Sequence, residues 1–176
     1  MRFHILATAA VVVMLGATPA LSGTLADATF HSNALNADLP VNIYRPDGEP
    51  PENGWPVLYL LHGHDVDQNS WRDLGNIEKT LDGMIAAGTI RPLVVVMPGV
   101  KNSWYVDSAA VDGPGDYDTA ITSDLRSHVE KTLPVRKDRQ GRAIAGLSMG
   151  GFGALHLAYS HEDLYAAVAS MSGAIW

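Results

Sequence analysis

Residues 146–150 read Gly-Leu-Ser-Met-Gly, a spacing that can present a serine for nucleophilic chemistry. The segment follows the short apolar run 143–145 and precedes FGALHLAYS, an apolar stretch of small residues typical of a closely packed helix. A G-x-S-x-G sequence between a strand and a helix forms a sharp turn with the serine at its strained tip. Gly146 and Gly150 are expected there because a Cβ atom would strike the neighbouring strand or helix. Ser148 is therefore the candidate nucleophile, and the helix N-terminus beside it favours developing negative charge.

A second polar cluster, HGHDVD at 62–67, follows the apolar run 57–61. Its histidines and aspartates could be metal ligands, or the turn could act through its backbone N–H groups. A binuclear metallohydrolase of the metallo-β-lactamase type requires H-x-H-x-D-H, which this segment does not match, and no later His-rich segment completes a metal shell. The sequence therefore favours the backbone alternative and predicts no metal ion and no other cofactor.

Backbone donors are what a serine-based acyl transfer requires. Two N–H groups stabilise the tetrahedral oxyanion, one from the residue after the nucleophile and one from an earlier loop at the end of a strand. Met149 would supply the first and His64 the second, while Gly63 would let the backbone approach the substrate. His64 is thus expected to act through its amide and not through its ring.

Strands that could hold these turns are visible as apolar runs. The runs 57–61 and 93–97 are continuous, as in strands buried on both faces of a mostly parallel sheet. The segments 25–31 and 40–45 instead predict an antiparallel pair. Ligands of such sheets bind beyond the carboxyl ends of the strands, and both polar turns lie at such ends.

Helices are predicted between the strands. Apolar residues recur at helical spacing from 74 to 85 and from 121 to 133, and Gly88 and Pro134 end the two patterns. Strands that alternate with helices predict an α/β fold, a mostly parallel sheet with helices on both faces.

Composition narrows the possible partners. The 176 residues carry a formal net charge of -7, which argues against nucleic acid or an anionic membrane as a partner. The chain has no cysteine, so disulfides, thiolate metal sites and a cysteine nucleophile are excluded. A hydrophobic content of 47% is enough for one domain with a packed core.

The N-terminus has the layout of a secretory signal peptide. One arginine precedes an apolar run at 5–17, and small residues follow around Ala20 and Ser22. The run is shorter than the roughly 20 residues needed to span a bilayer, so no stable membrane anchor is expected after cleavage. The sequence thus predicts a signal peptide at 1–22, a mature domain at 23–176 and a secreted or periplasmic location.

Four segments together resemble one known family. These are LYLLHGHDVDQNSW, VVVMPGVKNSWYVDS, SDLRSHVEKTLP and RAIAGLSMGGFGALHLAYSHEDLYAAVASMSGA, and the similarity covers roughly residues 30–176. They are similar to the esterase D family of α/β-hydrolases, which includes S-formylglutathione hydrolases, feruloyl and acetylxylan esterases and trehalose mycolyltransferases. The resemblance implies an α/β-hydrolase fold, Ser148 as nucleophile and the amides of His64 and Met149 as oxyanion hole. It also suggests Trp71, Trp104 and Tyr105 as residues that line an acyl or aryl pocket, although each could equally be ordinary packing.

One departure from the family is expected to matter. The family places its triad Asp and His after the nucleophile, on later strand ends. His156 lies eight positions along the helix from Ser148, about 12 Å away, and so cannot reach it. We expect His161, Glu162 and Asp163 to be solvated in the turn that ends this helix. Upstream, His128 and Asp124 are expected to face the surface of a packed helix.

The chain is therefore predicted to be incomplete at its C-terminal end, without the last strands of the fold. The strand near 166–171 would then be an exposed edge, and the 176 residues alone would be nearly inactive.

The predicted function is that of a secreted serine carboxylic-ester hydrolase that acts through an acyl-serine intermediate on a small-molecule or carbohydrate ester. Transfer of the acyl group to a sugar hydroxyl is the alternative that shares every step except the acceptor. A catalytically dead, truncated relative is the non-enzymatic alternative.

Overall fold

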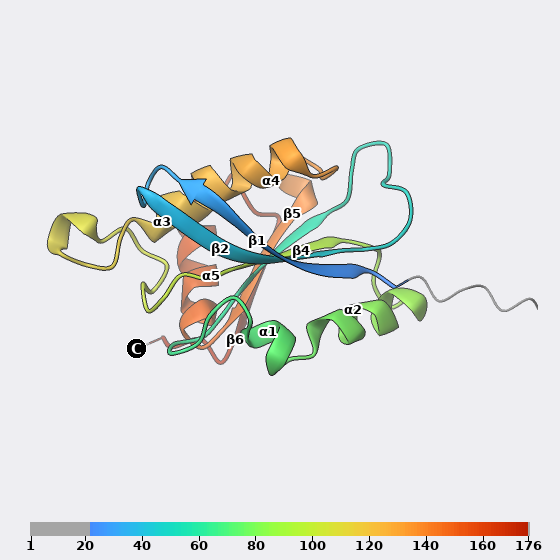
Figure 1. Ribbon diagram of the computed structural model, residues 1–176, viewed down its shortest axis with the longest axis horizontal. Coiled ribbons are helices and arrows are strands. Elements are labelled where there is room, and N and C mark those ends of the chain that lie inside the picture. Colours follow the sequence, from blue (N-terminus) through green and yellow to red (C-terminus); the bar gives the residue numbers. More distant parts are fainter. Residues whose placement is uncertain (1–21, 176) are drawn as a thin grey trace, which may run out of the picture.

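The computed structural model describes residues 22–175 as one six-stranded sheet with helices on both faces (Figure 1), so the predicted signal peptide lies almost wholly outside the described residues. The strand order is β1-β2-β4-β3-β5-β6. The strands β3, β4, β5 and β6 are parallel, while β1 and β2 are antiparallel to their neighbours. Their bounds are Thr24–Ser32 (β1), Ala37–Arg45 (β2), Val57–Leu61 (β3), Val94–Pro98 (β4), Arg142–Leu147 (β5) and Ala167–Met171 (β6). The predicted α/β fold and the antiparallel pair at its start are confirmed.

The helices form two layers, one on each face of the sheet (Figure 1). The short α1 and the amphipathic α2 cover one face, and a longer helical stretch together with α5 covers the other. Their bounds are Ser70–Asp73 (α1), Ile77–Ala86 (α2), Tyr117–Thr119 (α3), Ala120–Leu125 (η2, a π-helix), Arg126–Thr132 (α4) and Met149–Ser160 (α5), with short 3-10 turns at Ala109–Val111 (η1) and Arg139–Gly141 (η3).

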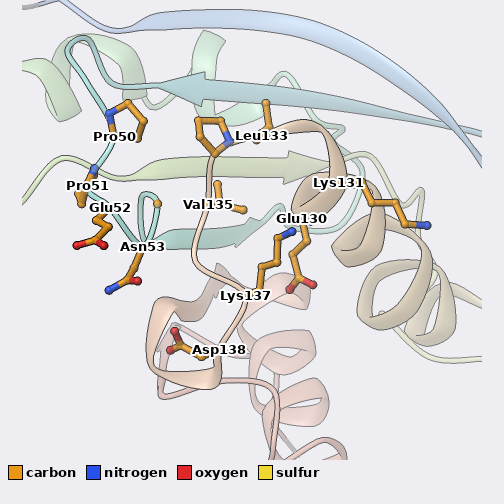
Figure 2. A pocket seen from close by; sticks show the side chains of 12 residues that line it. Pro50, Pro51, Glu52, Asn53, Glu130, Lys131, Leu133, Val135, Lys137 and Asp138 are labelled. Carbon is orange, nitrogen blue, oxygen red and sulfur yellow. The ribbon is translucent and has the colours of Figure 1, made fainter.

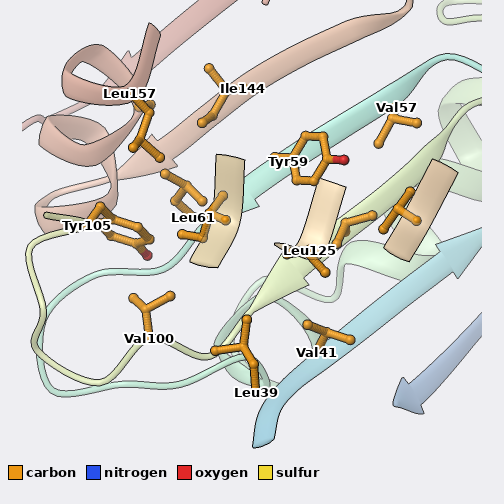
Figure 3. Close-up of a cluster of buried hydrophobic side chains, with 14 of the residues drawn as sticks. Leu39, Val41, Val57, Tyr59, Leu61, Val100, Tyr105, Leu125, Ile144 and Leu157 are labelled. Atoms are coloured by element: carbon orange, nitrogen blue, oxygen red, sulfur yellow. The ribbon is translucent and has the colours of Figure 1, made fainter. Parts of the chain in front are cut away.

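Strand β3 shows how the sequence builds this sandwich. Val57, Tyr59 and Leu61 point to the face covered by α4 and α5, and Leu60 points to the face covered by α1 and α2. Every residue of the strand is apolar because both faces are buried, as expected for a parallel strand at the centre of a sheet. Figure 3 shows the larger of the two clusters, in which Leu61 from β3 lies close to Tyr105.

Two helices differ from the sequence prediction at their starts. The apolar pattern places Leu74 in the helix that begins there, but α2 begins at Ile77 and Leu74 ends α1 with 80% of its surface exposed. Asn76 adopts a left-handed conformation, φ 46°, and this breaks the helix between the two residues. The predicted helix at 121–133 begins earlier, at Tyr117, and contains the π-helical segment.

Asp118 ties this helical stretch to α5. One carboxylate oxygen lies 2.6 Å from Nε2 of His161, and the other lies 3.2 Å from Nε2 of His156. The Thr122 hydroxyl also donates to it, at 3.2 Å. His161 is therefore not simply solvated, contrary to the sequence expectation, because the turn after α5 folds back on α3. Glu162 and Asp163 are exposed as expected.

The expectation for His128 and Asp124 is also corrected. The His128 ring stacks on Phe30 with ring centroids 5.1 Å apart. The Asp124 carboxylate accepts hydrogen bonds from the Ser32 hydroxyl at 2.8 Å and from the Ala34 N–H at 2.9 Å. Both side chains fasten the hairpin of β1 and β2 to the helical layer instead of facing solvent.

Strand β6 is the most exposed of the six. It pairs with β5, and in the part of the chain that the structure describes all five of its residues are exposed to solvent, as expected for an open edge. The same strand nevertheless supports the centre of the molecule, because the Met171 carbonyl accepts the N–H of Ser148 at 2.9 Å.

The Asp118 network generates a stability prediction. Asp118→Ala is expected to lower the free energy of unfolding by about 1–3 kcal/mol, because hydrogen bonds from two half-buried imidazoles lose their charged acceptor. Asp38→Ala is the matched control: it removes a single ion pair to His31 whose side chains are 57% and 71% exposed, and should cost about 0–1 kcal/mol. Urea unfolding of both variants measures the difference, and equal losses would contradict the prediction.

Candidate active site

Ser148 stands at the tip of the turn between β5 and α5. Its backbone has φ 55° and ψ -115°, a conformation that costs a residue with a side chain of order 1–3 kcal/mol. Hydrogen bonds on both sides hold it there. Its N–H donates to Met171, and its carbonyl accepts from the N–H of Phe152 at 3.0 Å and of Ala174 at 3.2 Å. The strain is thus fixed by the surrounding backbone.

The two glycines of the motif have the steric role that the sequence predicts. A Cβ atom on Gly150 would overlap the carbonyl oxygens of Leu61 and His62, and one on Gly146 would overlap the carbonyl of Gly150. Helix α5 can therefore start against the end of β3 only because these positions lack side chains.

Gly63 lies beside the serine but is less crowded than expected. A Cβ atom there would meet the Ser148 Cβ and the Leu147 carbonyl at 3.6 Å, which is ordinary contact. The protein itself would accept alanine at this position, so close approach of a substrate remains the reason predicted for glycine.

His62 is the first histidine of the 62–67 turn, and the structure shows what its ring contacts. Its side chain is almost completely buried, at 1% exposure. Nε2 accepts the N–H of Val100 at 3.0 Å, and Nδ1 lies 2.7 Å from the carbonyl oxygen of Gly63. Burial lowers the pKa of His62 below its ordinary value of 6.5, against smaller opposing effects from the Gly63 carbonyl and Asp67. A neutral imidazole that bonds only to backbone is part of the scaffold.

His64 and Asp65 sit at the exposed part of the same turn. His64 Nδ1 lies 3.1 Å from the Asp65 carboxylate. Asn102 donates to that carboxylate at 2.8 Å and accepts the Asp65 N–H at 2.8 Å. The hydrogen bond from Asn102, and then that from His64, hold the pKa of Asp65 below its ordinary value. Among residues 22–175, no three His, Asp or Glu side chains are grouped so that they could hold a metal ion.

The loop after β4 clamps this turn from the side. The Tyr105 hydroxyl donates to the His62 carbonyl at 2.8 Å, and the Trp104 ring lies 6.1 Å from the His64 ring and 5.7 Å from the Phe152 ring. Trp104 and Tyr105 both have left-handed backbone, with φ of 57° and 61°. Such strain in large residues persists only where the surroundings fix it, and it is frequent at functional sites.

A cavity of about 350 Å³ opens next to Ser148, at the carboxyl ends of the strands. Its walls are largely apolar and come from the 62–66 turn, from α1 and from the end of β5. They are formed by His62, Gly63, His64, Val66, Ser70, Trp71, Leu74, Gly75, Leu147 and Ser148.

The structure places the three aromatic residues suggested for a pocket differently. Trp71 lines the cavity, whereas Trp104 does not, and Tyr105 is completely buried under the 62–65 turn. The sequence analysis missed Val66, Leu74 and Leu147, which line the cavity although each is at least 36% exposed. The signal in the sequence was the presence of the apolar residues Val66 and Leu147 within the two motifs at 62–67 and 146–150.

A larger cavity, about 750 Å³, lies at the opposite ends of the strands (Figure 2). The turn at 50–54 and the segment from Glu130 to Asp138 form it, and its lining is rich in charged side chains. Size alone does not make it the site, because ligands of open α/β sheets bind beyond the carboxyl ends of the strands.

The hydroxyl of Ser148 has no hydrogen-bond partner among residues 22–175, and none of the described histidine rings is hydrogen-bonded to it. The N–H groups of His64 and Met149 likewise have no acceptor within this range. Among residues 22–175, the geometry therefore offers a strained serine, two backbone donors without an acceptor and an apolar cavity, with no histidine hydrogen-bonded to the serine.

Comparison with known proteins shows the family of the chain. Residues 32–176 match the Esterase family model. The chain belongs to the esterase family of α/β-hydrolases. The chain is 31% identical over 135 residues to an endo-1,4-beta-xylanase/feruloyl esterase of Xylanibacter ruminicola, and the match covers 73% of the chain and 19% of that protein. It is 32% identical over 151 residues to Esterase Rv1288 of Mycobacterium tuberculosis, over 82% of the chain and 31% of that protein.

A solved structure of a ferulic acid esterase superposes on this chain with a TM-score of 0.79 and 31% identity, over 87% of the chain and 61% of that structure. The chain thus spans less than two thirds of the length of each of these relatives. The predicted family and fold are confirmed, while the individual site residues remain predictions.

The buried His62 generates a prediction about pH. Because its pKa is lowered in the folded state, the unfolded chain takes up a proton below about pH 6.5 while the folded protein does not. Stability should therefore fall as the pH decreases from 6.5, with a contribution of at most about 1.4 kcal/mol per pH unit. His62→Gln keeps every other histidine, so its unfolding free energy, measured in urea from pH 8 to pH 5, should fall less steeply. Parallel curves for the two proteins would contradict the lowered pKa.

Proposed function

We propose that the protein hydrolyses carboxylic esters through an acyl intermediate on Ser148. The observation that carries this proposal is the strained Ser148 turn at an apolar cavity that His64 also lines, together with the N–H groups of His64 and Met149, which have no acceptor among residues 22–175. Membership of the esterase family supports the same class of reaction.

The reaction follows from these groups. The Ser148 hydroxyl oxygen attacks the ester carbonyl carbon, and a general base takes its proton. The N–H groups of His64 and Met149 donate to the oxyanion of the tetrahedral intermediate, where one such donor contributes about 3–4 kcal/mol. The alcohol leaves with a proton, and water then releases the acid from the acyl-serine. The proposal requires a general base, in this family a histidine, within reach of the Ser148 hydroxyl.

The cavity supports an apolar acyl group as the preferred substrate. Trp71, Val66, Leu74 and Leu147 form its apolar walls, and a volume of about 350 Å³ leaves room for a ring or a short alkyl chain. Two of the relatives compared are a feruloyl esterase and a ferulic acid esterase, whose names specify an aromatic acyl group.

Ser148→Ala tests the nucleophile in the protein encoded by the complete reading frame. Wild type is expected to hydrolyse p-nitrophenyl acetate and to be labelled by a fluorophosphonate probe, and the variant should lose both because no other oxygen occupies the tip of the turn. Mass spectrometry should place the label on Ser148.

Two controls accompany this test. His64→Ala keeps the amide and should retain much of the activity, and EDTA should change nothing. Normal turnover by Ser148→Ala, or loss of turnover with EDTA that zinc restores, would refute the proposal.

Leu74→Ala tests the cavity. Leu74 is 80% exposed, so its truncation should leave stability unchanged but remove part of the wall that contacts a longer acyl chain. We expect kcat/KM for p-nitrophenyl butyrate to fall about tenfold, and that for the acetate ester to change much less. Val111→Ala, at a residue 78% exposed and outside the cavity, is the matched control. Equal effects of Leu74→Ala on both esters would exclude this cavity as the acyl site.

We also propose that the protein is exported. The support is the charged start, apolar run and small residues of positions 1–22. Within residues 22–175, no helix has both the length and the apolar character to cross a membrane. Expression in the native host should yield a protein outside the cytoplasm whose N-terminus, by Edman sequencing, follows Ala20 or Ser22. Recovery of the uncleaved chain from the cytoplasm alone would contradict export.

A further inference from the structure

Both ring nitrogens of His62 are committed to backbone partners, and this fixes the tautomer of the ring. A backbone N–H can only donate, so the bond from Val100 to Nε2, 3.0 Å long, requires that Nε2 carries no proton. A neutral ring then carries its proton on Nδ1. That N–H donates to the Gly63 carbonyl oxygen, 2.7 Å away. The lowered pKa of His62 favours this neutral form.

The acceptor of this bond belongs to a particular peptide unit. The Gly63 carbonyl and the His64 N–H are the two ends of the same peptide, and no cis peptide bond occurs among residues 22–175. In a planar trans peptide the C=O and N–H vectors point in opposite directions. A ring that holds the carbonyl on one side therefore sets the direction of the N–H on the other, and this N–H has no acceptor among the described residues.

We propose that His62 is a positioning residue for the oxyanion hole: its Nδ1–H anchors the Gly63 carbonyl, so that the His64 N–H is aimed at the carbonyl oxygen of an ester bound at Ser148. This inference rests on the proposed function and adds a residue to it. Two features make the anchor rigid: the ring is 1% exposed, and Val100 is completely buried.

The anchor also strengthens the donor. A hydrogen bond accepted by a carbonyl polarises its peptide, and chained hydrogen bonds strengthen one another by about 10–30% per bond. The chain here runs from the Val100 N–H through the imidazole and the Gly63–His64 peptide to the oxyanion. His62 does not act as the general base, because both of its nitrogens are already occupied.

A purely structural His62 would affect folding and not the transition state. The two roles separate with a pair of variants that each keep one of the two bonds. In His62→Asn the amide nitrogen lies near the position of Nδ1 and can still donate to the Gly63 carbonyl, but no acceptor reaches Val100. In His62→Gln the amide oxygen lies near the position of Nε2 and can still accept from Val100, but the Gly63 carbonyl loses its donor.

The experiment compares both variants with wild type, using the protein from the complete reading frame and p-nitrophenyl acetate. We expect His62→Gln to lower kcat about 10- to 100-fold with KM within about threefold, and His62→Asn to retain kcat within about threefold, although both variants melt at lower temperature. A loss of kcat and kcat/KM by the same factor is the sign of an interaction made only in the transition state.

Tyr105→Phe is the matched control. It removes the buried hydrogen bond from the Tyr105 hydroxyl to the His62 carbonyl, which is similar in length to the bond from His62 Nδ1 to the Gly63 carbonyl. The His62 carbonyl belongs to the His62–Gly63 peptide, whose N–H is not the proposed oxyanion donor. It should lower the melting temperature while kcat stays within about threefold. If His62→Gln and His62→Asn lose kcat equally, or if Tyr105→Phe loses as much as His62→Gln, the positioning role is refuted.

A measurement on wild type that does not depend on catalysis tests the proposal even if the variants fail to fold. Long-range ¹H–¹⁵N NMR spectra of the wild-type histidine rings at pH 7 should show His62 with its proton on Nδ1, and a proton on Nε2 would overturn the proposal. Absence of ester turnover and of Ser148 labelling in wild type would instead refute the proposed function and the inference that rests on it. If wild type is active but His62→Gln and His62→Asn lose kcat equally, the inference alone is refuted.

Discussion

The contact between the first turn of α5 and the end of β3 is the constraint on which the rest of the site depends. Gly150 touches the carbonyl oxygens of Leu61 and His62 so closely that no side chain fits between them. This contact brings the N-terminus of α5 and the end of β3 together, and Ser148 has to adopt a left-handed backbone to join β5 to the helix. The serine, the unpaired N–H groups of the first helical turn and the 62–65 turn meet at one point for this single steric reason.

The second constraint comes from the loop after β4, which reaches the 62–65 turn through one backbone group and through several side chains. Val100 contributes an N–H, and Tyr105 contributes a hydroxyl directed at a carbonyl. The Tyr105 ring in turn packs on α5 at Gly153, where a Cβ atom would overlap it. The ends of β3 and β4 and the start of α5 are thus locked together, which suits a site that stabilises charge with peptide dipoles already in place.

The sequence predicted the local features of this arrangement and missed the long-range ones. The apolar runs of β3 and β4 reflect burial common to a whole strand, and the glycine spacing around Ser148 reflects contacts between neighbours in the chain. Both features can therefore be recognised without knowledge of the fold. The contacts of His62 with Val100 and of Asp118 with His161 join residues that are 38 and 43 positions apart. Nothing in the local sequence of these residues indicates such contacts. The left-handed backbone at Trp104 and Tyr105 opposes the preference of large residues, so only tertiary packing explains it.

The π-helical segment Ala120–Leu125 has a consequence for how this protein can change during evolution. A π turn carries one more residue than an α turn, and each residue of an α-helix turns the chain by about 100°. Because the extra residue is absorbed within this turn, deletion of one residue would convert the segment to a regular helix and leave α3 and α4 in nearly the same relative orientation. Asp118 would then keep the side on which it meets His156 and His161. The loss of one residue here is therefore expected to be tolerated more readily than the loss of one residue from a regular α-helical segment, where it would rotate the two parts of the helix by about 100°.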